Sequence, residues 1–543
     1  MTKKILTLPC MLQTSFERFA DNTALVFVGE APRTYRDLQQ DVEHVGRMLR
    51  AAGISRGAKV AILSQNMPNW AVAYFAVAVT GGVVVPILPD FHPEEIANII
   101  EHSEAEAIFV SESLLGKLKP EMHTSLTVFR TDDLRQISGK TAPLPDTPFE
   151  YESVGEDDLL SIIYTSGTTG RSKGVMLTHK NIVWTTQQCR SLQHIVGTDR
   201  FLSILPLPHT FENTLGLMLP VMHGASVHYI RKAPTPSVLL PALATVKPTI
   251  MLSVPLVIEK IYRSKILPQV NGKAITRTLY KISPFRKLIN RMIGRKLMET
   301  FGGEIVFFGV GGAKLDAQTE RFLYEAKFPL AIGYGLTETS PLLAGAVGKN
   351  RRLSSTGIPM EGVRLRIANV NANGEGEIQA QGPNVMRGYY KDPKQTQEAF
   401  TADGWFRTGD LGRFRKGMLY IHGRIKNMIV GANGENIYPE DIESVINKMG
   451  YVLESLVVQQ KGRLVAMVHL NMEEIDRKVR QMKQFHDETV QNINAFIDEI
   501  LLEIQNKVNE QVNHYSRIQT VIFQPEPFKK TPTLKIKRFL YYQ

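Results

Sequence analysis

Cysteine is scarce in this chain, which has only Cys10 and Cys189 among 543 residues. Two cysteines so far apart in the sequence provide neither a disulfide framework nor a thiolate zinc site, and they favour a reducing compartment. The start of the chain, MTKKILTLPCML, lacks the length and the small-residue cleavage site of a signal peptide. We therefore expect a cytoplasmic protein that binds no metal through thiolates.

A continuous apolar run long enough to span a membrane is also missing. The nearest approach is residues 70–88, WAVAYFAVAVTGGVVVPIL, which carry no charge. Gly81 and Gly82 divide this run into an alanine-rich half and a valine-rich half that ends at Pro86. That division predicts a buried helix, a turn and a buried parallel strand rather than a membrane span.

The order of the segments predicts an α/β fold, with neither an internal repeat nor a low-complexity tract. Short apolar runs such as KVAILSQN, EAIFVSES, PTIMLSVP and EIVFFGVGG alternate with segments of helical period, which favours mostly parallel sheets with covering helices. NANGEGEIQAQG, at residues 371–382, is typical of a hairpin turn. Residues 473–516 contain no Gly or Pro and place apolar residues three and four apart, which predicts amphipathic helices.

The length exceeds what one hydrophobic core organises, so we expect at least two domains. The texture of the sequence changes after Gly423. We predict a large N-terminal domain at residues 1–423, built of layered, mostly parallel sheets, and a small α+β C-terminal domain at residues 424–543 joined to it by a hinge.

The net charge of +11 is concentrated in residues 259–299, which hold eleven basic residues and only two acidic ones, Glu259 and Glu299. Such a patch suits an anionic membrane leaflet, placing the protein at the inner face of the membrane as a peripheral protein. It equally suits the phosphates of coenzyme A or an acidic carrier protein, and a solvated helical surface is the simplest alternative. Nucleic acid is disfavoured because no recognition motif accompanies the charge.

The most informative motif is residues 164–179, YTSGTTGRSKGVMLTH. Its glycines let the backbone approach an anion closely, its hydroxyls and amides donate hydrogen bonds, and Lys173 adds a positive charge. An apolar segment of strand length precedes it, and HKNIVWTTQQC after it is expected to open a helix, giving strand, phosphate loop and helix. The usual nucleotide-triphosphatase loop needs Lys followed by Ser or Thr, whereas Gly174 follows here. A flexible linker is the alternative.

This motif resembles the signature of the adenylate-forming, or AMP-binding, enzymes. Further segments resemble family blocks in the same order: LPLPHTFENT, GVGGAKL, YGLTETS, GWFRTGDLG, GRIKNMIVGANGENIYPEDIE and TPTLKIKR. Residues 254–262, VPLVIEKIY, and the C-terminal amphipathic segment look like those of bacterial long-chain fatty-acid–CoA ligases. The resemblance implies ATP, Mg²⁺ and coenzyme A as reactants and cofactor, and an AMP-forming ligase that acts on a fatty acid.

The resemblance also assigns roles to individual residues. Those implied to hold the β- and γ-phosphates are Thr165, Ser166, Gly167, Thr168, Thr169, Gly170 and Lys173, and Thr165 and Glu338 are the implied Mg²⁺ ligands. Thr337 would hold the α-phosphate, and Gly311, Gly312, Ala313, Tyr334 and Gly335 would surround the adenine. Asp410 is implied for the ribose and Arg424 for the ribose and phosphate, Lys426 for the hinge and His209 for the border of the acyl tunnel.

Lys535 is the residue implied to bridge the carboxylate and the α-phosphate in the first step, with Lys537 as the alternative alignment. Two positions depart from the family pattern. Asn427 replaces a common Asp and is expected to alter an ion pair, and Ser172 replaces a common Pro and is expected to loosen the loop. Acyl carrier protein as the acceptor, or a non-catalytic nucleotide- or lipid-binding role, stay open as alternatives.

Overall fold

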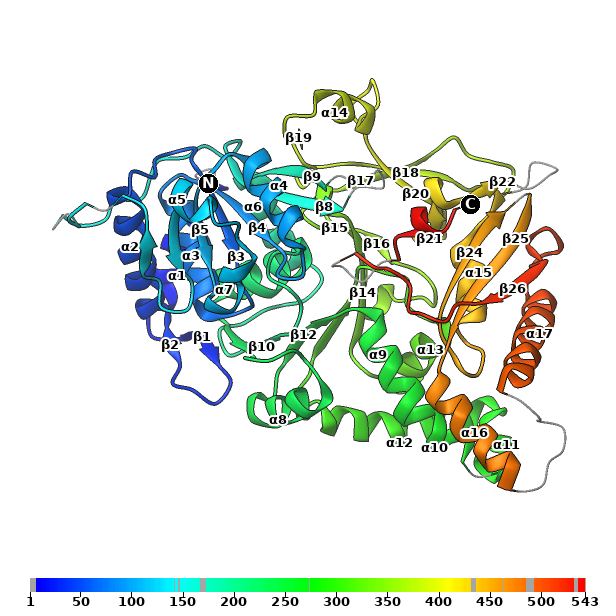
Figure 1. Cartoon of the computed structure of the whole chain (residues 1–543). Helices are drawn as coiled ribbons and strands as arrows, with labels where there is room; N and C mark the ends of the chain where they lie inside the picture. Colours follow the sequence, from blue (N-terminus) through cyan, green and yellow to red (C-terminus); the bar gives the residue numbers. More distant parts are fainter. Residues whose placement is uncertain are drawn as a thin grey trace. The chain divides into compact units, whose positions relative to one another are not determined.

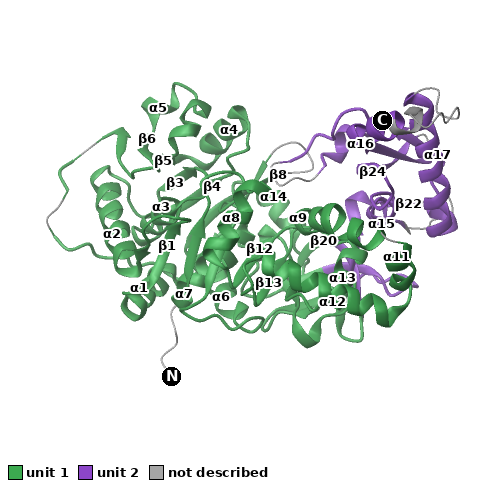
Figure 2. Ribbon diagram, turned by 90° about the horizontal axis from the view of Figure 1, so that it is seen from below, with its two compact units in different colours: residues 1–366, 379–408, 415–420 green, residues 367–378, 409–414, 421–543 purple. Residues whose placement is uncertain are grey.

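The computed structural model describes residues 6–140, 142–144, 147–166, 172–272, 274–430, 436–460, 462–484, 493–531 and 536–542. The chain divides into two compact units, shown in different colours in Figure 2. Unit 1 comprises residues 1–366, 379–408 and 415–420, and unit 2 comprises residues 367–378, 409–414 and 421–543. The predicted domain boundary after residue 423 stays a prediction.

Unit 1 contains two large sheets. The first has the order β16 (Ile358–Pro359), β15 (Leu342–Ala346), β14 (Leu330–Gly335), β13 (Phe307–Val310), β12 (Ile250–Ser253), β10 (Arg200–Ser203), β11 (Ser226–Tyr229), β1 (Thr23–Phe27) and β2 (Arg33–Thr34). Its strands pair in parallel from β1 to β14, and β2, β15 and β16 add antiparallel edges.

The second sheet of unit 1 repeats this plan. Its order is β19 (Gly388–Tyr389), β9 (Ser172–Thr178), β8 (Leu159–Ser166), β4 (Val83–Ile87), β3 (Lys59–Leu63), β5 (Ala105–Val110), β6 (Thr127–Arg130) and β7 (Gln136–Ser138). The strands from β8 to β6 are parallel, and β7, β9 and β19 are antiparallel. The predicted α/β fold with mostly parallel sheets is confirmed (Figure 1).

Helices surround both sheets of unit 1. They are α1 (Leu8–Phe19), α2 (Tyr35–Ala51), α3 (Pro68–Val79), α4 (Pro93–Ser103), α5 (Met122–Ser125), α6 (His179–Cys189), α7 (Leu219–His223), α8 (Pro236–Val246), α9 (Pro255–Ile261), α10 (Leu267–Asn271), α11 (Ala274–Tyr280), α12 (Ser283–Thr300), α13 (Ala317–Glu325) and α14 (Pro393–Ala399). Short helical turns are η1 (Glu112–Lys117), η4 (Thr337–Thr339) and η5 (Gly348–Asn350), and η2 (Glu212–Met218) and η3 (Tyr262–Ile266) have π-helical geometry.

The uncharged run at residues 70–88 forms a buried helix, a turn and a strand, as predicted. Every residue of α3 is buried, because α3 contacts β1 of the first sheet as well as β3 and β4 of the second. A helix enclosed on all sides has no polar face, which explains its even apolar composition. None of the helices within the described residues is long and apolar enough to cross a membrane.

The phosphate-loop motif departs from the predicted order of strand, loop and helix. A second strand, β9, follows the loop and pairs antiparallel with β8, and only then does α6 begin at His179. In β9, Val175 and Leu177 are buried and Met176 between them is less so, which is the alternation of a strand. The motif is therefore a β-hairpin, and the N-terminus of α6 lies at the far end of β9 from the loop.

Unit 2 has the α+β character that was expected of the C-terminal part. Its main sheet has the order β24 (Val452–Gln460), β25 (Arg463–Leu470) and β26 (Thr520–Phe523), and β22 (Ile429–Val430) pairs with β23 (Asn436–Ile437). Its helices are α15 (Pro439–Ile446), α16 (Met472–Gln484) and α17 (Ile493–Gln511), with the short turns η6 (Ile425–Asn427), η7 (His514–Ser516) and η8 (Arg538–Leu540). The predicted amphipathic helices are α16 and α17, which bury residues such as Ile475, Val479, Ile500 and Ile504.

A further sheet has the order β17 (Arg364–Ala368), β18 (Gly376–Gln381), β20 (Phe406–Arg415) and β21 (Met418–Arg424). The predicted hairpin turn lies between β17 and β18. The amide of Asn371 donates to the carbonyl of Glu375, and Gly374 takes a positive φ of 75°. A left-handed residue at this point explains the glycine.

Candidate active site

The two ends of the phosphate-loop hairpin bring together two of the predicted residues. Thr165 on β8 is paired directly with Lys173 on β9, so both side chains lie on the same face of the hairpin. Ser166 pairs with Ser172 one step closer to the loop. Gly167, Thr168, Thr169 and Gly170 lie outside the described residues.

Ser172, the first described residue after the loop, makes a side-chain hydrogen bond, and its expected loosening of the loop stays a prediction. Its hydroxyl donates a hydrogen bond to Oε1 of Glu95 over 2.8 Å. Glu95 belongs to the first turn of α4, so this bond ties one end of the loop to a helix that packs against the same sheet. The hydroxyl thus supplies a tether that a proline at this position would not offer.

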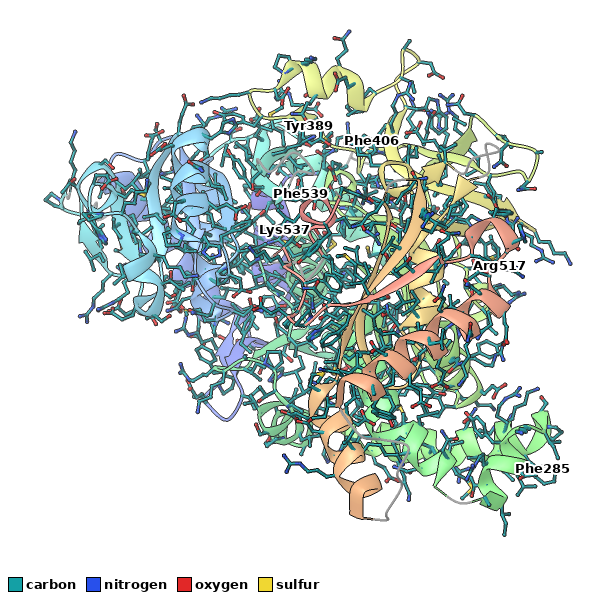
Figure 3. The ribbon with its side chains drawn as sticks, turned by 45° about the vertical axis from the view of Figure 1, so that its right-hand side comes forward. Phe285, Tyr389, Phe406, Arg517, Lys537 and Phe539 are labelled. Atoms are coloured by element: carbon teal, nitrogen blue, oxygen red, sulfur yellow. The ribbon has the colours of Figure 1, made fainter. Side chains whose placement is uncertain are left out.

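Tyr389 links the loop lysine to the predicted metal ligand. The ammonium of Lys173 lies 5.1 Å from the centroid of the Tyr389 ring, and the Tyr389 hydroxyl donates to Oε1 of Glu338 over 3.0 Å. The sequence motifs above do not include Tyr389. The consecutive tyrosines of RGYYKDP are a usable signal, because a tyrosine offers both a ring face and a hydroxyl. Figure 3 labels Tyr389.

Thr337 and Glu338 project from a closed turn between β14 and β15. The amide of Leu336 donates to the carbonyl of Pro341, and the Thr339 hydroxyl donates to the same oxygen over 2.6 Å. A Cβ at Gly335 would lie 1.7 Å from that oxygen, so only glycine fits there. The turn is therefore specified by its own sequence, and it fixes the backbone that carries Thr337 and Glu338.

His209 has a local role in the structure. Its Nδ1 accepts a hydrogen bond from the amide of Phe211 over 3.2 Å, and its predicted place at the border of the acyl tunnel stays a prediction. The next residue, Thr210, donates from its hydroxyl to the Thr337 hydroxyl over 3.4 Å. The segment after β10 thus reaches the closed turn through Thr210.

The glycine motif after β13 is partly buried and partly exposed. Gly311 is buried, and a Cβ there would lie 3.3 Å from the Phe211 ring. Gly312, with a φ of +85°, and Ala313 are exposed, so they leave backbone free for a flat base. Tyr334 is only 8% exposed, so most of its ring packs within the protein.

An apolar pocket with a cavity volume of about 40 Å³ lies beside these motifs in unit 1. Its lining includes Phe211 and Leu215 from the η2 region, Gly309 and Val310 of β13, Gly333 of β14, Gly345 of β15 and Cys189 of α6. His209 is not among the lining residues, whereas Phe211 is. Burial raises the pKa of the Cys189 thiol to about 12, so it is an uncharged, apolar part of this wall.

Glu212 begins η2 as a buried carboxyl that sequence analysis did not single out. It is 2% exposed; Ser203 donates to its Oε1 over 2.6 Å, and Oε2 has no hydrogen-bond partner among the described residues. Asn66 in turn donates to the Ser203 hydroxyl. Desolvation raises the pKa of Glu212 to about 8, so the carboxyl is neutral over most of the physiological range.

We expect Glu212→Gln to change how stability depends on pH. The folded state keeps the Glu212 proton up to about pH 8, while the unfolded state releases it near 4.5, so the wild type loses stability as the pH rises between these values. The variant has no such proton, and its amide oxygen still accepts from Ser203. Its advantage in unfolding free energy over the wild type should grow by up to about 1.4 kcal/mol per pH unit. Tm differences at about pH 6 and about pH 8 measure this, and a pH-independent difference would contradict it.

Unit 2 brings together the two residues predicted to hold the ribose. Nε of Arg424 lies 3.0 Å from Oδ1 of Asp410, which is buried, whereas about half of the Arg424 side chain is exposed. Lys426 is exposed in η6. Lys535 lies outside the described residues, but Lys530 and Ile536 on either side of it form an antiparallel bridge.

Asn427, the other departure from the family pattern, is matched to its surroundings in unit 2. Its side-chain amide donates to Oε1 of Glu440 over 2.6 Å. An aspartate there would place a second carboxylate against Glu440, which is unfavourable. The expected effect of Asn427 on an ion pair stays a prediction, and the structure adds an amide–carboxylate hydrogen bond at this position.

The site offers few acidic ligands, as expected for a Mg²⁺ ion that is bound mainly by the phosphates of a nucleotide. The described residues contain no group of three His, Cys, Asp or Glu side chains that would enclose a metal ion. Mg²⁺ bound with a nucleotide needs only one or two protein ligands, because phosphates and water complete its shell. Glu338, held by a neutral hydroxyl, fits that requirement.

Comparison with known proteins agrees with the motifs. Residues 12–390 match the AMP-binding enzyme family. The chain is 30% identical to the long-chain-fatty-acid–CoA ligase FadD15 of Mycobacterium bovis, with 90% of this chain and 87% of that protein covered. It is 27% identical to the chloroplastic long-chain-fatty-acid–[acyl-carrier-protein] ligase AEE15 of Arabidopsis thaliana, with 98% and 84% covered.

Solved structures share the fold over almost the whole chain. The o-succinylbenzoate CoA synthetase MenE of Bacillus subtilis, in complex with its acyl-adenylate intermediate, superposes with a TM-score of 0.78 at 21% identity, covering 98% of this chain and 97% of that one. The anthranilate CoA ligase AuaEII gives a TM-score of 0.77 at 21% identity, covering 99% and 97%.

Proposed function

Because the chain belongs to the AMP-binding enzyme family, we propose that it joins a long-chain fatty acid to coenzyme A through an acyl-adenylate. The observation that carries the choice of substrate is the apolar cavity behind Gly309 and Gly333. A wall of this composition stabilises a hydrocarbon chain by keeping it from water and offers few polar partners to a small acid.

In the proposed first step, a carboxylate oxygen of the fatty acid attacks the α-phosphorus of ATP, and pyrophosphate leaves. Lys173 and Thr165 hold the departing phosphates, and Thr337 orients the α-phosphate. Glu338, with Thr165, would hold Mg²⁺, which neutralises phosphate charge when bound. Lys535 would balance the charge on the carboxylate and the α-phosphate.

In the proposed second step, the sulfur of coenzyme A attacks the acyl carbonyl, the bond to AMP breaks and the thiol proton passes to solvent. Asp410 and Arg424 would hold the ribose of the adenylate, since a carboxylate accepts from both of its hydroxyls. The family resemblance implies that the C-terminal part changes orientation between the steps, with Lys426 near the pivot.

The similarity to AEE15 favours one alternative acceptor, acyl carrier protein. The deciding experiment is AMP release from ATP, Mg²⁺ and palmitate with coenzyme A, with acyl carrier protein, and with neither. Palmitoyl-CoA formation supports the proposal, and turnover with carrier protein alone replaces it by the alternative. If no AMP is released with any acid from acetate to stearate, both the proposal and the alternative are overturned.

The cavity makes a separate prediction about chain length. A Cβ at Gly345 would lie 3.1 Å from Leu192, another lining residue, so Gly345→Val should fill part of the cavity. We expect kcat/KM for palmitate to fall about tenfold relative to octanoate, because one or two misplaced methylenes in a pocket cost about 1–3 kcal/mol. Octanoate turnover by the same variant is the internal control, and equal losses for both acids would show that the cavity does not hold the chain.

A further inference from the structure

Helix α12 carries bulky apolar side chains on a face that no other described part of unit 1 covers. Phe285, Leu288 and Met292, here called the apolar stripe, are 46%, 55% and 60% exposed. Their spacing of three and four residues places them on one side of the helix. Figure 3 labels Phe285 at the lower right of the view.

The opposite face of α12 is fixed firmly to unit 1. Asn290, Gly294 and Leu297 are buried, and a Cβ at Gly294 would lie 2.7 Å from that of Ala326. Arg286 pairs with Glu325 at 2.9 Å, and Asn290 donates to the same carboxylate over 2.8 Å. The orientation of the helix is therefore determined by its inner face, and the exposure of the apolar stripe follows from it.

A row of cations runs beside the apolar stripe. Lys287, Arg291 and Arg295, here called the basic row, are spaced four residues apart and are all exposed. Neither Arg291 nor Arg295 forms an ion pair with any of the described residues, and the one carboxylate near Lys287, that of Glu325, is already paired with Arg286. Two more exposed apolar residues precede the apolar stripe in the sequence. They are Ile282, just before α12, and Ile275 of α11, which are 48% and 76% exposed.

We propose that α11 and α12 dock the protein on an anionic lipid bilayer, with the apolar stripe at the boundary of the acyl chains and the basic row on the headgroups. An interfacial helix needs a row of bulky apolar side chains, cations beside it and a low overall hydrophobicity, and α12 has all three. The cations supply the charge complementarity, since anionic headgroups attract each exposed Lys or Arg near the surface. This docking needs neither ATP nor a fatty acid, so it stands independently of the proposed reaction.

The test is co-sedimentation of the full chain with vesicles of phosphatidylcholine, alone and mixed with phosphatidylglycerol, at low and high salt. We expect binding to the mixed vesicles that weakens with salt. The combined variant Lys287→Gln, Arg291→Gln and Arg295→Gln should bind them at least about tenfold more weakly. The combined variant Phe285→Ser, Leu288→Ser and Met292→Ser should also lose binding.

Leu502→Ser is the matched control, because Leu502 on α17 is equally exposed at 59% but has acidic neighbours in Glu499 and Glu503. It should bind as the wild type does. The far-UV circular dichroism spectrum and the Tm of every variant should match those of the wild type, which shows that each one is folded. The proposal is overturned if the wild type does not bind the vesicles or if all variants bind them equally. It is also overturned if the apolar stripe serves dimerisation or an acidic carrier protein and the chain does not bind vesicles.

Discussion

Lys535→Ala is expected to lower the rate of acyl-adenylate formation about 10²–10³-fold, the usual cost of removing one preorganised charge from a transition state. The same variant should still transfer a supplied acyl-adenylate to coenzyme A at close to the normal rate, because the family resemblance places this lysine in the first step only. Pyrophosphate release reports the first step and thioester formation the second. An equal loss in both would mean that the lysine serves binding or folding instead.

The neighbouring lysines provide the controls for this experiment. Lys537 is the alternative alignment, and its amide donates to the carbonyl of Lys529 next to the bridge between Lys530 and Ile536. Lys537→Ala, at a half-buried position, and the exposed Lys529→Ala should each leave adenylation within about threefold of the wild type, as expected for charges outside the site. If Lys537→Ala shows the large loss and Lys535→Ala does not, the alignment shifts by two residues.

Glu338→Gln is expected to lower kcat about 10²-fold and to raise the Mg²⁺ concentration needed for half-maximal rate. The amide has the shape of the carboxylate and still accepts from Tyr389, so the closed turn should keep its geometry. What is lost is the negative charge that attracts the cation, and hard divalent cations require charged or strongly polar oxygens. Initial rates over a Mg²⁺ titration measure both effects.

Tyr389→Phe separates the charge of Glu338 from its orientation. This variant keeps the carboxylate and the ring near Lys173 but removes the hydrogen bond at 3.0 Å. Loss of a group that orients a metal ligand typically weakens metal affinity about tenfold or more. The rate at saturating Mg²⁺ should therefore recover in Tyr389→Phe but not in Glu338→Gln, and recovery in both would remove Glu338 from the metal site.

The parts of the fold that were predictable are those with one dominant local signal. Gly81 and Gly82 divide an uncharged run in a way that fits only a helix, a turn and a strand, and α3 and β4 follow. The strand β9 was missed because the small, polar residues around Lys173 obscure the alternation of Val175 and Leu177. Its existence depends on pairing with β8, a tertiary contact that a local pattern does not contain.

The candidate site was predictable where a motif carries its own geometry. Gly335 is required by a carbonyl only six residues away, so the YGLTETS block is a nearly self-contained unit. Tyr389 and Glu212 were missed for the opposite reason. Tyr389 matters because a strand pairing brings it to Glu338, 51 residues earlier in the chain, and Glu212 because burial changes the charge of an ordinary carboxyl.

The hydrogen bond between Asn427 and Glu440 couples the evolution of these two positions. An amide facing a carboxylate is favourable, whereas two carboxylates at 2.6 Å are not, so a lineage that carries aspartate at the first position needs a neutral or basic residue at the second. Replacement of Asn427 first brings two carboxylates together, so the replacement of Glu440 should come before it or with it. An alignment of relatives would show this as covariation between the two positions, without any knowledge of the reaction.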